Sequence, residues 1–299
     1  MEKRKYGNTD MTVSVLGFGG AEIGFQGASP KAVSELLNNA LDAGLNVIDT
    51  AECYVNSEEL IGEAIQGRRD QYYLFTKCGH SPESYEIGAW SKSEILDSVE
   101  RSLKRLRTDR LDLVHLHSCD LEQLKNGEVI EALQEAKKAG KTRYIGYSGD
   151  GEAALYAIKC GAFDSLQTSV NIADQEAIDL TLPAARAANM GVIAKRPVAN
   201  AAWKEKSFPD YYYIQEYWNR FQKLNYGFLN GDMQDAISKA LRFTLSVPGV
   251  CTAIVGTTKA KRWQENAKLL EKGPLPEAEF EEIRKQWKEK SQPDWVGQI

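Results

Sequence analysis

Four residues of this chain, Asp49, Tyr54, Lys77 and His117, have side chains suited to proton transfer, and they stand in the segments IDTAECY, LFTK and HLHS. A tyrosine hydroxyl with a pKa of about 10 is a poor acid at neutral pH. A nearby lysine ammonium favours the phenolate and lowers that pKa. An aspartate paired with the lysine would hold it in place, and a histidine could orient a carbonyl oxygen. We therefore expect a proton-transfer site.

These groups can meet only if the apolar runs that precede them are strands ending at one rim. Along the chain, short apolar runs alternate with amphipathic stretches, and glycine often separates a helical stretch from the next run. The candidate strands are Val13–Gly19, Asn46–Asp49, Tyr72–Thr76, Asp112–His117, Arg143–Ser148, Ser165–Val170, Gly191–Ala194 and Thr252–Val255. Eight such strands, most separated by one helical pattern, predict a (β/α)8 barrel, in which active groups stand at the carboxyl ends of strands. A doubly wound sheet is the alternative, but no GxGxxG opens a first helix.

Two segments lie outside the strand–helix alternation. Residues 4–13 read as an N-terminal β-hairpin, with Gly7–Asp10 as its turn. Residues 199–230 are rich in aromatic side chains and stand between the seventh and eighth strands, where a long loop would overhang the barrel mouth. The run Tyr211–Tyr213 in this segment either packs on a helix or forms a lid over substrate or cofactor.

The C-terminal part divides into a charged stretch and a tail. Residues 277–290 predict a solvated helix, and a tail begins at about residue 291. Trp295 in that tail is either disordered or closes the pocket. No linker or low-complexity tract interrupts residues 1–299, so we expect a single barrel domain.

Composition excludes several classes of protein. The 299 residues carry 37 basic and 42 acidic side chains, a net charge of −5, and 42% are hydrophobic. That apolar content argues against disorder, and the acidic balance argues against a surface that tracks nucleic acid. No apolar run reaches the roughly 20 residues that span a bilayer, and no apolar stretch follows the charged N-terminus to make a signal peptide. Five scattered cysteines without a CxxC motif fit a reducing cytoplasm.

The four residues and their contexts resemble the catalytic tetrad of the aldo-keto reductase superfamily. The similarity extends to further segments, which are LGFGG at 16–20, IGYS at 145–148, SLQ at 165–167 with Asn171, IVGTT at 254–258 and RWQEN at 262–266. Each motif alone is a weak signal, but together, in this order and at these spacings, they are a strong one. The resemblance covers roughly residues 3 to 270. The resemblance implies a TIM-barrel reductase that reduces aldehydes or ketones, aldoses included, or runs the reverse reaction. Tyr54 would be the proton donor, tuned by Lys77 and Asp49, and His117 would help to position the substrate.

The resemblance also implies a nicotinamide cofactor bound without a Rossmann domain, and no metal. Its cofactor-binding residues would be Gly20, Ala21, Asp49, Ser148, Gln167, Lys195, Arg196, Val198, Gly256, Thr258, Arg262, Glu265 and Asn266. Three cations, Lys259, Lys261 and Arg262, lie just before an expected helix, and they favour NADP(H), with NAD(H) also possible. We expect the substrate to be a small carbonyl compound or alcohol. We expect the protein to be a monomer or a small homo-oligomer.

The chain departs from the family pattern at two places. Lys195 stands where many members have a tyrosine that stacks on the nicotinamide, and Trp203 could supply the missing aromatic face. Gly149 follows Ser148 in place of the usual asparagine. Both departures bear on cofactor geometry rather than on proton transfer.

Other interpretations remain open at this point. Cys53, Cys78 and Cys119 with His80 and His117 could form a metal-binding rim, as in a metal-dependent barrel hydrolase. Packing by small polarizable thiols is the alternative reading of these cysteines. A cofactor-sensing regulatory subunit, similar to the potassium-channel β subunits, is a third class. His115 points to the same face as His117 and is expected to be a satisfied core histidine.

Overall fold

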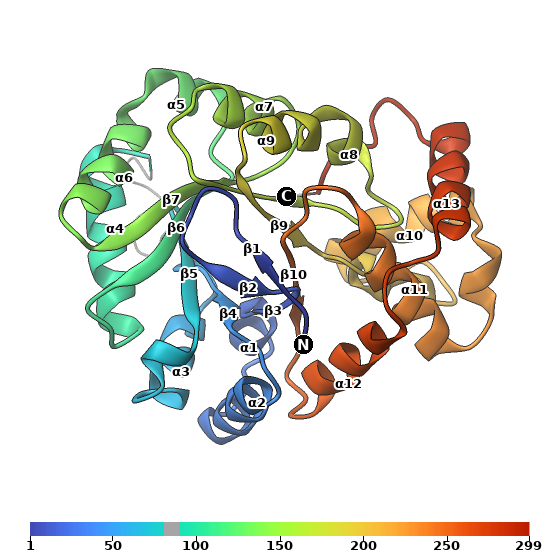
Figure 1. Ribbon diagram of the computed structural model, residues 1–299, viewed down its shortest axis with the longest axis horizontal. Coiled ribbons are helices and arrows are strands. Elements are labelled where there is room, and N and C mark those ends of the chain that lie inside the picture. The colour runs from blue at the N-terminus through green and yellow to red at the C-terminus, as the bar shows by residue number, and fades with distance from the viewer. Residues whose placement is uncertain (81–89, 299) are drawn as a thin grey trace.

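A computed structural model describes residues 1–80 and 90–298 of the chain. In these residues eight parallel strands close into a barrel, in the order β10-β3-β4-β5-β6-β7-β8-β9. The barrel strands are β3 (Leu16–Gly19), β4 (Val47–Asp49), β5 (Tyr73–Cys78), β6 (Leu111–His117), β7 (Thr142–Ser148), β8 (Ser165–Ser169), β9 (Gly191–Lys195) and β10 (Thr252–Gly256). Figure 1 shows the helices arranged around this barrel, so the predicted TIM barrel is confirmed.

The helices follow from amphipathic stretches with recognisable ends. They are α1 (Ala21–Phe25), α2 (Pro30–Asp42), α3 (Ser57–Ala64), α4 (Lys92–Arg105), α5 (Leu121–Asn126), α6 (Glu128–Lys138), α7 (Gly151–Lys159), α8 (Glu176–Leu180), α9 (Leu182–Ala187), α10 (Tyr212–Leu224), α11 (Met233–Ser246), α12 (Arg262–Leu269) and α13 (Glu277–Lys290). At the start of α4, the Ser91 side chain accepts a hydrogen bond from the Glu94 amide, which satisfies an otherwise unpaired donor. Ile95 and Val99 then face the barrel and are fully buried. Among the described helices, none combines the length and apolar character that a membrane span requires.

The N-terminal hairpin closes the end of the barrel where the strands begin. It consists of β1 (Lys3–Lys5) and β2 (Thr12–Ser14), paired antiparallel. Tyr6 and Met11, next to the turn, are fully buried, and the Tyr6 hydroxyl lies 2.5 Å from the hydroxyl of Ser165 at the start of β8. The hairpin therefore plugs the barrel floor with side chains and leaves the opposite end for the site.

The predicted first strand, Val13–Gly19, is wrong at its beginning. Val13 pairs with Arg4 in the hairpin, and the barrel strand starts only at Leu16. The chain changes sheets here because the Asn46 side chain accepts from the Ser14 amide at 2.6 Å and donates to the Thr12 carbonyl at 2.9 Å. A segment that the sequence predicts as one strand therefore contributes to two sheets.

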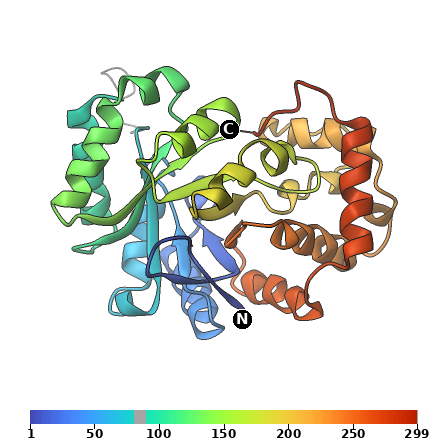
Figure 2. The same ribbon diagram turned by 45° about the horizontal axis from the view of Figure 1, so that its top comes forward.

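The aromatic-rich segment after β9 contains helices rather than one open loop. It forms a 3-10 helix η2 (Ala199–Lys204), then α10, then a second 3-10 helix η3 (Gly227–Asn230). Both views place α10 to α13 together on one side of the barrel (Figures 1 and 2). Of the predicted aromatic run, Tyr212 and Tyr213 begin α10, with Tyr212 76% exposed.

The C-terminal helix and tail return to the barrel mouth. The predicted helix 277–290 is confirmed as α13, although Ile283 and Trp287 on it are buried. Trp295 is also buried and packs against Trp287, with ring centroids 5.4 Å apart. Beyond it, the Gln298 carbonyl accepts from Lys195 at the end of β9. Trp295 is therefore ordered by packing, and Gln298 lies beside the end of β9.

Candidate active site

The ends of β4, β5 and β6 bring the four predicted catalytic residues together at one rim. Lys77 Nζ lies 2.5 Å from Asp49 Oδ2, 2.8 Å from the Thr50 carbonyl oxygen and 3.4 Å from the Tyr54 hydroxyl. The Tyr54 and His117 rings meet edge to face, with centroids 5.6 Å apart. The geometry expected from the sequence is therefore present: an acid, an amine, a phenol and an imidazole share one small volume.

Lys77 and Asp49 form a buried ion pair, each only 1% exposed. Burial raises the pKa of Asp49, while the Lys77 ammonium and two hydrogen bonds oppose that rise. Because charge-assisted contacts of this length are strong, the pair fixes the ammonium beside the phenol. The second oxygen of Asp49 accepts from Gln167 at 2.9 Å.

Tyr54 differs from the sequence expectation in one respect. Burial raises the pKa of Tyr54 well above its usual value, and the Asp49 charge adds to the rise. The expected lowering by Lys77 is therefore outweighed by loss of solvation in this structure. The physical result is a phenol that stays protonated at neutral pH and holds its proton in contact with the Lys77 ammonium.

His117 is held in its neutral form. Burial lowers its pKa well below the usual value, and Lys77 and His80 lower it further. Its Nδ1 lies 3.3 Å from Cys53 Sγ, and the His80 ring packs on it with centroids 5.5 Å apart. A neutral imidazole can donate a single hydrogen bond toward an oxygen at the mouth.

His115 is a core histidine, as the sequence suggested, but it is only partly satisfied, because within the described residues its buried Nδ1 has no hydrogen-bond partner. It is fully buried, and its Nε2 lies 3.0 Å from the Ser165 hydroxyl. Because His115 points into the barrel interior near the hairpin plug, it belongs to the packed floor and not to the mouth.

Two of the predicted cofactor residues join the tetrad directly. The Ser148 hydroxyl donates to the Gln167 side-chain oxygen at 3.2 Å, and Gln167 in turn donates to Asp49. All three are buried, with Ser148 and Asp49 at the ends of β7 and β4 and Gln167 in the middle of β8. This chain of amide and hydroxyl groups could bind a carboxamide, which both donates and accepts.

Lys195 has a partner that sequence reasoning missed. Its Nζ lies 2.8 Å from Asp150 Oδ2 and 3.0 Å from the Gln298 carbonyl oxygen. Asp150 also accepts from Thr168 and from the Ser169 amide, at 2.7 and 2.6 Å. The lysine charge is therefore neutralised locally, so Lys195 does not place a free cation at the mouth. Asp150 stands two residues after Ser148, so the aspartate follows the glycine that replaces the family's asparagine.

Arg196, the neighbour of Lys195, reaches the start of α10. Its guanidinium donates to the Tyr213 hydroxyl at 3.0 and 2.7 Å and covers the Tyr213 ring at 4.8 Å. It also donates to Ser169 at 3.2 Å and to the Gln298 carbonyl. Trp203, the proposed aromatic substitute, packs edge-on against Phe221, with centroids 5.4 Å apart.

The remaining predicted cofactor residues lie around the ends of β3 and β10. Gly20 donates its amide to the Asp49 carbonyl at 2.7 Å, with Ala21 beginning α1. A side chain at Gly256 would collide with the Glu22 carboxylate, a neighbour that sequence reasoning missed. Val198, Thr258, Glu265 and Asn266 occupy the surrounding loop and helix positions.

The N-terminal end of α12 carries a group of cations. Burial lowers the pKa of Lys204, and the nearby charges of Arg262 and Lys259 lower it further. Arg262 also lies 3.3 Å from Glu265, and its side chain is 32% exposed. Because like charges gather here beside the amino end of a helix, the arrangement suits a phosphate group.

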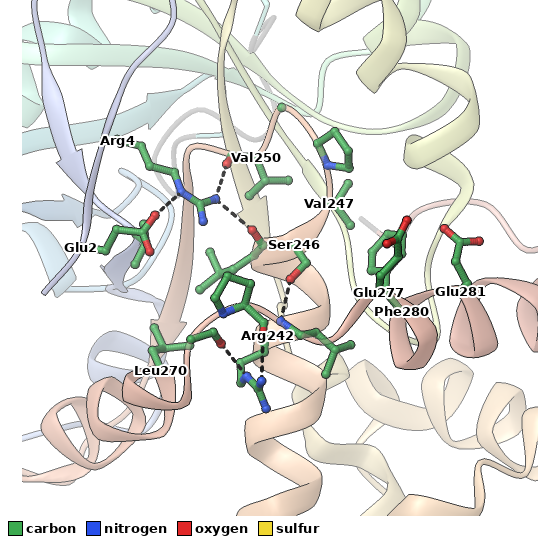
Figure 3. Close-up of a pocket in the computed structure, with 17 residues that line it drawn as sticks. Glu2, Arg4, Arg242, Ser246, Val247, Val250, Leu270, Glu277, Phe280 and Glu281 are labelled. Atoms are coloured by element: carbon green, nitrogen blue, oxygen red, sulfur yellow. Dashed lines mark hydrogen bonds and ion pairs between the residues drawn. The ribbon is translucent and has the colours of Figure 1, made fainter.

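Outside the rim, neither a metal centre nor a second polar site is evident in the described residues. Within residues 1–80 and 90–298, no group of three or more His, Cys, Asp or Glu side chains is arranged to hold a metal ion. A groove of about 650 Å³ lies between the hairpin and α11 to α13, at the opposite end from the tetrad. Figure 3 shows its arginines turned to backbone carbonyls, with Arg4 donating to Leu245 and Val250 and Arg242 donating to Gly273 and Pro274. These contacts stabilise loops.

Comparison with known proteins agrees with the geometry of the rim. The sequence model of the Aldo/keto reductase family matches residues 15–288. The chain belongs to this family. Among its relatives are L-galactose dehydrogenase of Arabidopsis thaliana, 27% identical over 89% of this chain and 87% of the relative, and aldo-keto reductase yakc [NADP(+)] of Schizosaccharomyces pombe, 28% identical over 94% and 90%. The holo form of aldo-keto reductase AKR11C1 from Bacillus halodurans superposes with a TM-score of 0.82, at 28% identity over 99% of both chains.

Proposed function

We propose that this member of the aldo/keto reductase family is an NADP(H)-dependent oxidoreductase that interconverts carbonyl compounds and alcohols. The observation that carries the proposal is the contact of the half-buried Tyr54 hydroxyl with the Lys77–Asp49 ion pair. A bound nicotinamide supplies or accepts the hydride. The residues present fit such a group, because Ser148 and Gln167 offer donors and acceptors next to Asp49.

Tyr54 acts as the proton donor in the direction of reduction. Its phenol keeps its proton at rest because burial disfavours the phenolate. As negative charge develops on the carbonyl oxygen, the phenol passes its proton to that oxygen, and the adjacent Lys77 ammonium stabilises the phenolate that remains. Asp49 holds Lys77 in place and prevents the ammonium from turning toward solvent. In oxidation the same groups work in reverse, with the phenolate accepting the alcohol proton.

His117 positions the carbonyl oxygen. It is neutral, so it can donate a hydrogen bond without placing a second full charge beside Lys77. Oriented donors of this type act where charge develops and are worth several kcal/mol in general, roughly 2.7–4 for one removed donor. Trp90 packs on His80 with centroids 5.0 Å apart, and this aromatic pair borders the same side of the mouth.

The preference for NADP(H) over NAD(H) rests on the cations at the start of α12. Arg262, Lys259 and Lys204 share one neighbourhood, and a 2′-phosphate is the cofactor group that distinguishes the two nucleotides. The name of the S. pombe relative includes NADP(+), which supports the same preference. Aldoses are included among the candidate substrates, and the plant relative named for L-galactose supports testing them.

The test is to follow oxidation of NADPH and NADH by absorbance with a panel of aldehydes, ketones and aldoses. We expect turnover with NADPH and at least one carbonyl class. Tyr54→Phe should abolish turnover while binding of the cofactor stays nearly unchanged, because the hydroxyl acts only in the transition state. A Tyr54→Phe variant that keeps more than about a tenth of the wild-type kcat would overturn the assignment. Tight cofactor binding without any turnover would favour a sensor subunit instead.

A further inference from the structure

Cys53 contacts the imidazole of His117 from the loop that carries Tyr54. Its Sγ lies 3.3 Å from His117 Nδ1, within hydrogen-bond distance for a sulfur atom. In the part of the chain that the structure describes, this is the one side-chain hydrogen bond of the His117 ring. The Tyr54 and His80 rings meet the His117 ring edge to face, with centroids 5.6 and 5.5 Å away.

The protonation states allow two arrangements of this hydrogen bond. Burial raises the pKa of the Cys53 thiol to about 11, so the sulfur carries its hydrogen at neutral pH. His117 is neutral and therefore has a hydrogen on only one of its two ring nitrogens. Donation of S–H to Nδ1 satisfies that nitrogen's lone pair and leaves the hydrogen on Nε2. The opposite arrangement would use sulfur as the acceptor and leave Nε2 without a hydrogen.

We propose that Cys53 is a positioning residue that selects the Nε2–H tautomer of His117, so that this nitrogen donates to the substrate oxygen. The inference rests on the proposed function for its consequence, but the tautomer itself is a property of the resting protein. In the other tautomer the Nε2 lone pair would face the carbonyl oxygen and repel it. The thiol thus makes the imidazole a donor that acts together with the Tyr54 phenol.

The backbone around Cys53 is fixed from both sides. Glu52 is buried and pairs with Arg101 at 2.5 Å, while its amide donates to the Lys77 carbonyl at 3.2 Å. The Tyr54 amide donates to the Ala51 carbonyl at 3.1 Å. Because Glu52 is anchored on α4, the loop presents Cys53 to His117 in a defined direction, as a positioning residue requires.

The tautomer can be measured directly, because the chain has only three histidines. Protein labelled with ¹⁵N-histidine is studied by long-range ¹H–¹⁵N correlation, which distinguishes Nδ1–H from Nε2–H imidazoles. His80→Gln and His117→Gln spectra assign the signals. We expect wild-type His117 to be the Nε2–H tautomer and Cys53→Ala to show a mixture or the Nδ1–H form. Cys53→Ser keeps a donor at the same position and should retain the wild-type tautomer.

Steady-state kinetics on the same variants measures the consequence. A lost neutral hydrogen bond corresponds to about a three- to tenfold fall, and we expect it in kcat for Cys53→Ala, with KM for NADPH unchanged. Cys53→Ser should recover to within about twofold. Cys119→Ala is the matched control, because it removes a buried thiol two residues beyond His117 that, within the described residues, is not a hydrogen-bond partner of the imidazole.

The NMR and kinetic results test the role of Cys53 and the proposed enzymatic function separately. Wild-type His117 in the Nδ1–H form, or an unchanged tautomer in Cys53→Ala, overturns the proposal whether or not the enzyme is active. A kcat loss in Cys119→Ala equal to that in Cys53→Ala also overturns it, since general repacking would then explain the effect. Absence of turnover in wild type, with the expected tautomer shift present, contradicts the proposed function and leaves the positioning of His117 supported.

Discussion

Asp49 accepts from Lys77 with one oxygen and from Gln167 with the other, at 2.5 and 2.9 Å. The same carboxylate therefore fixes the amine beside Tyr54 and the amide expected to meet the cofactor. An isolated carboxylate this deeply buried would be costly, and its two partners are what make ionisation tolerable. The proton-transfer groups and the cofactor side of the mouth are coupled through this one residue.

Lys77→Met tests that coupling. The phenol loses its neighbouring cation, so its pKa rises further and its phenolate is left unstabilised. We expect kcat to fall by about 10²–10⁴, and the pH–rate profile of any residual activity to shift toward higher pH. Rates measured across the accessible pH range provide the check, and an unchanged profile in an active variant would contradict the Tyr54–Lys77 contact.

Stability must be separated from chemistry in that experiment. Removing Lys77 leaves Asp49 as an unpaired buried carboxylate, and breaking such a pair costs about 3–5 kcal/mol. The double variant Lys77→Met with Asp49→Asn removes the unpaired charge, so it should regain most of the lost unfolding free energy without regaining activity. Chemical denaturation of both variants tests this, and a double variant as unstable as the single one would argue against the ion pair.

At the scale of elements, the loop between β4 and α3 holds a strained residue directly after Tyr54. Val55 has a φ of +53° and is 58% exposed. A β-branched residue in the left-handed region is a conformational outlier, and such strain persists where surrounding contacts impose it. Here the Ser57 amide donates to the Tyr54 carbonyl at 2.9 Å, which closes the turn that places the phenol at the mouth.

Val55→Asn should stabilise the protein. Asparagine tolerates the left-handed region, and relief of the strain is worth about 1–2 kcal/mol, with little burial lost because the side chain is exposed. Urea unfolding at constant pH measures the change. Val55→Thr is the control, because it alters polarity but keeps the β-branch and the strain. Equal midpoints for Asn and Thr would show that Val55 stores no strain energy.

The start of α12 is the second element with a functional consequence. Arg262 lies in the first turn, with Lys259 and Lys204 nearby. Loss of a charge-assisted contact costs about 1.5–3 kcal/mol, so Arg262→Ala should weaken NADPH binding about ten- to a hundredfold and leave NADH almost unchanged. Titration of both cofactors into wild type and variant measures this, with Lys268→Ala in the last turn of α12 as the control. An equal loss for both cofactors, or a wild-type preference for NADH, would contradict it.

For the whole molecule, the sequence predicts those strands and helices whose formation depends on interactions between residues close together in the chain. Strands such as Asp112–His117 are continuous apolar runs, and the spacing of strand ends places the tetrad once a barrel is assumed. The Lys195–Asp150 pair was missed because it joins the ends of β9 and β7, which only closure of the barrel brings together. The contact of Gln298 with β9 was missed for the same reason, since nothing in the tail sequence specifies its return. The break between Val13 and Leu16 depends on Asn46, which lies more than thirty residues away.

The tail is held against the barrel by a buried carboxylate, Asp174, in the loop after β8. Asp174 Oδ2 accepts from the Tyr217 hydroxyl at 3.1 Å and from the Gln298 amide at 3.3 Å. Arg220 lies 3.7 Å from the other oxygen. Three distant parts of the chain therefore meet at one group: the β8 loop, α10 and the tail. We therefore expect the charge on Asp174 to affect the free energy of unfolding.

The free energy of unfolding should depend on pH through the titration of Asp174. Burial raises its pKa from 3.8 to about 7, so the folded chain retains a proton that the unfolded chain has already lost. The stabilisation from this group is therefore complete below about pH 4 and is lost as pH rises toward about 7. Asp174→Asn stays neutral throughout, so its unfolding free energy should decline less than that of wild type across this window. Urea unfolding at several pH values measures both slopes, with Asp294→Asn, an exposed change in the same tail, as the control. Equal slopes for wild type and Asp174→Asn would mean that Asp174 is ionised in the folded protein at all these pH values, with Arg220 compensating its burial.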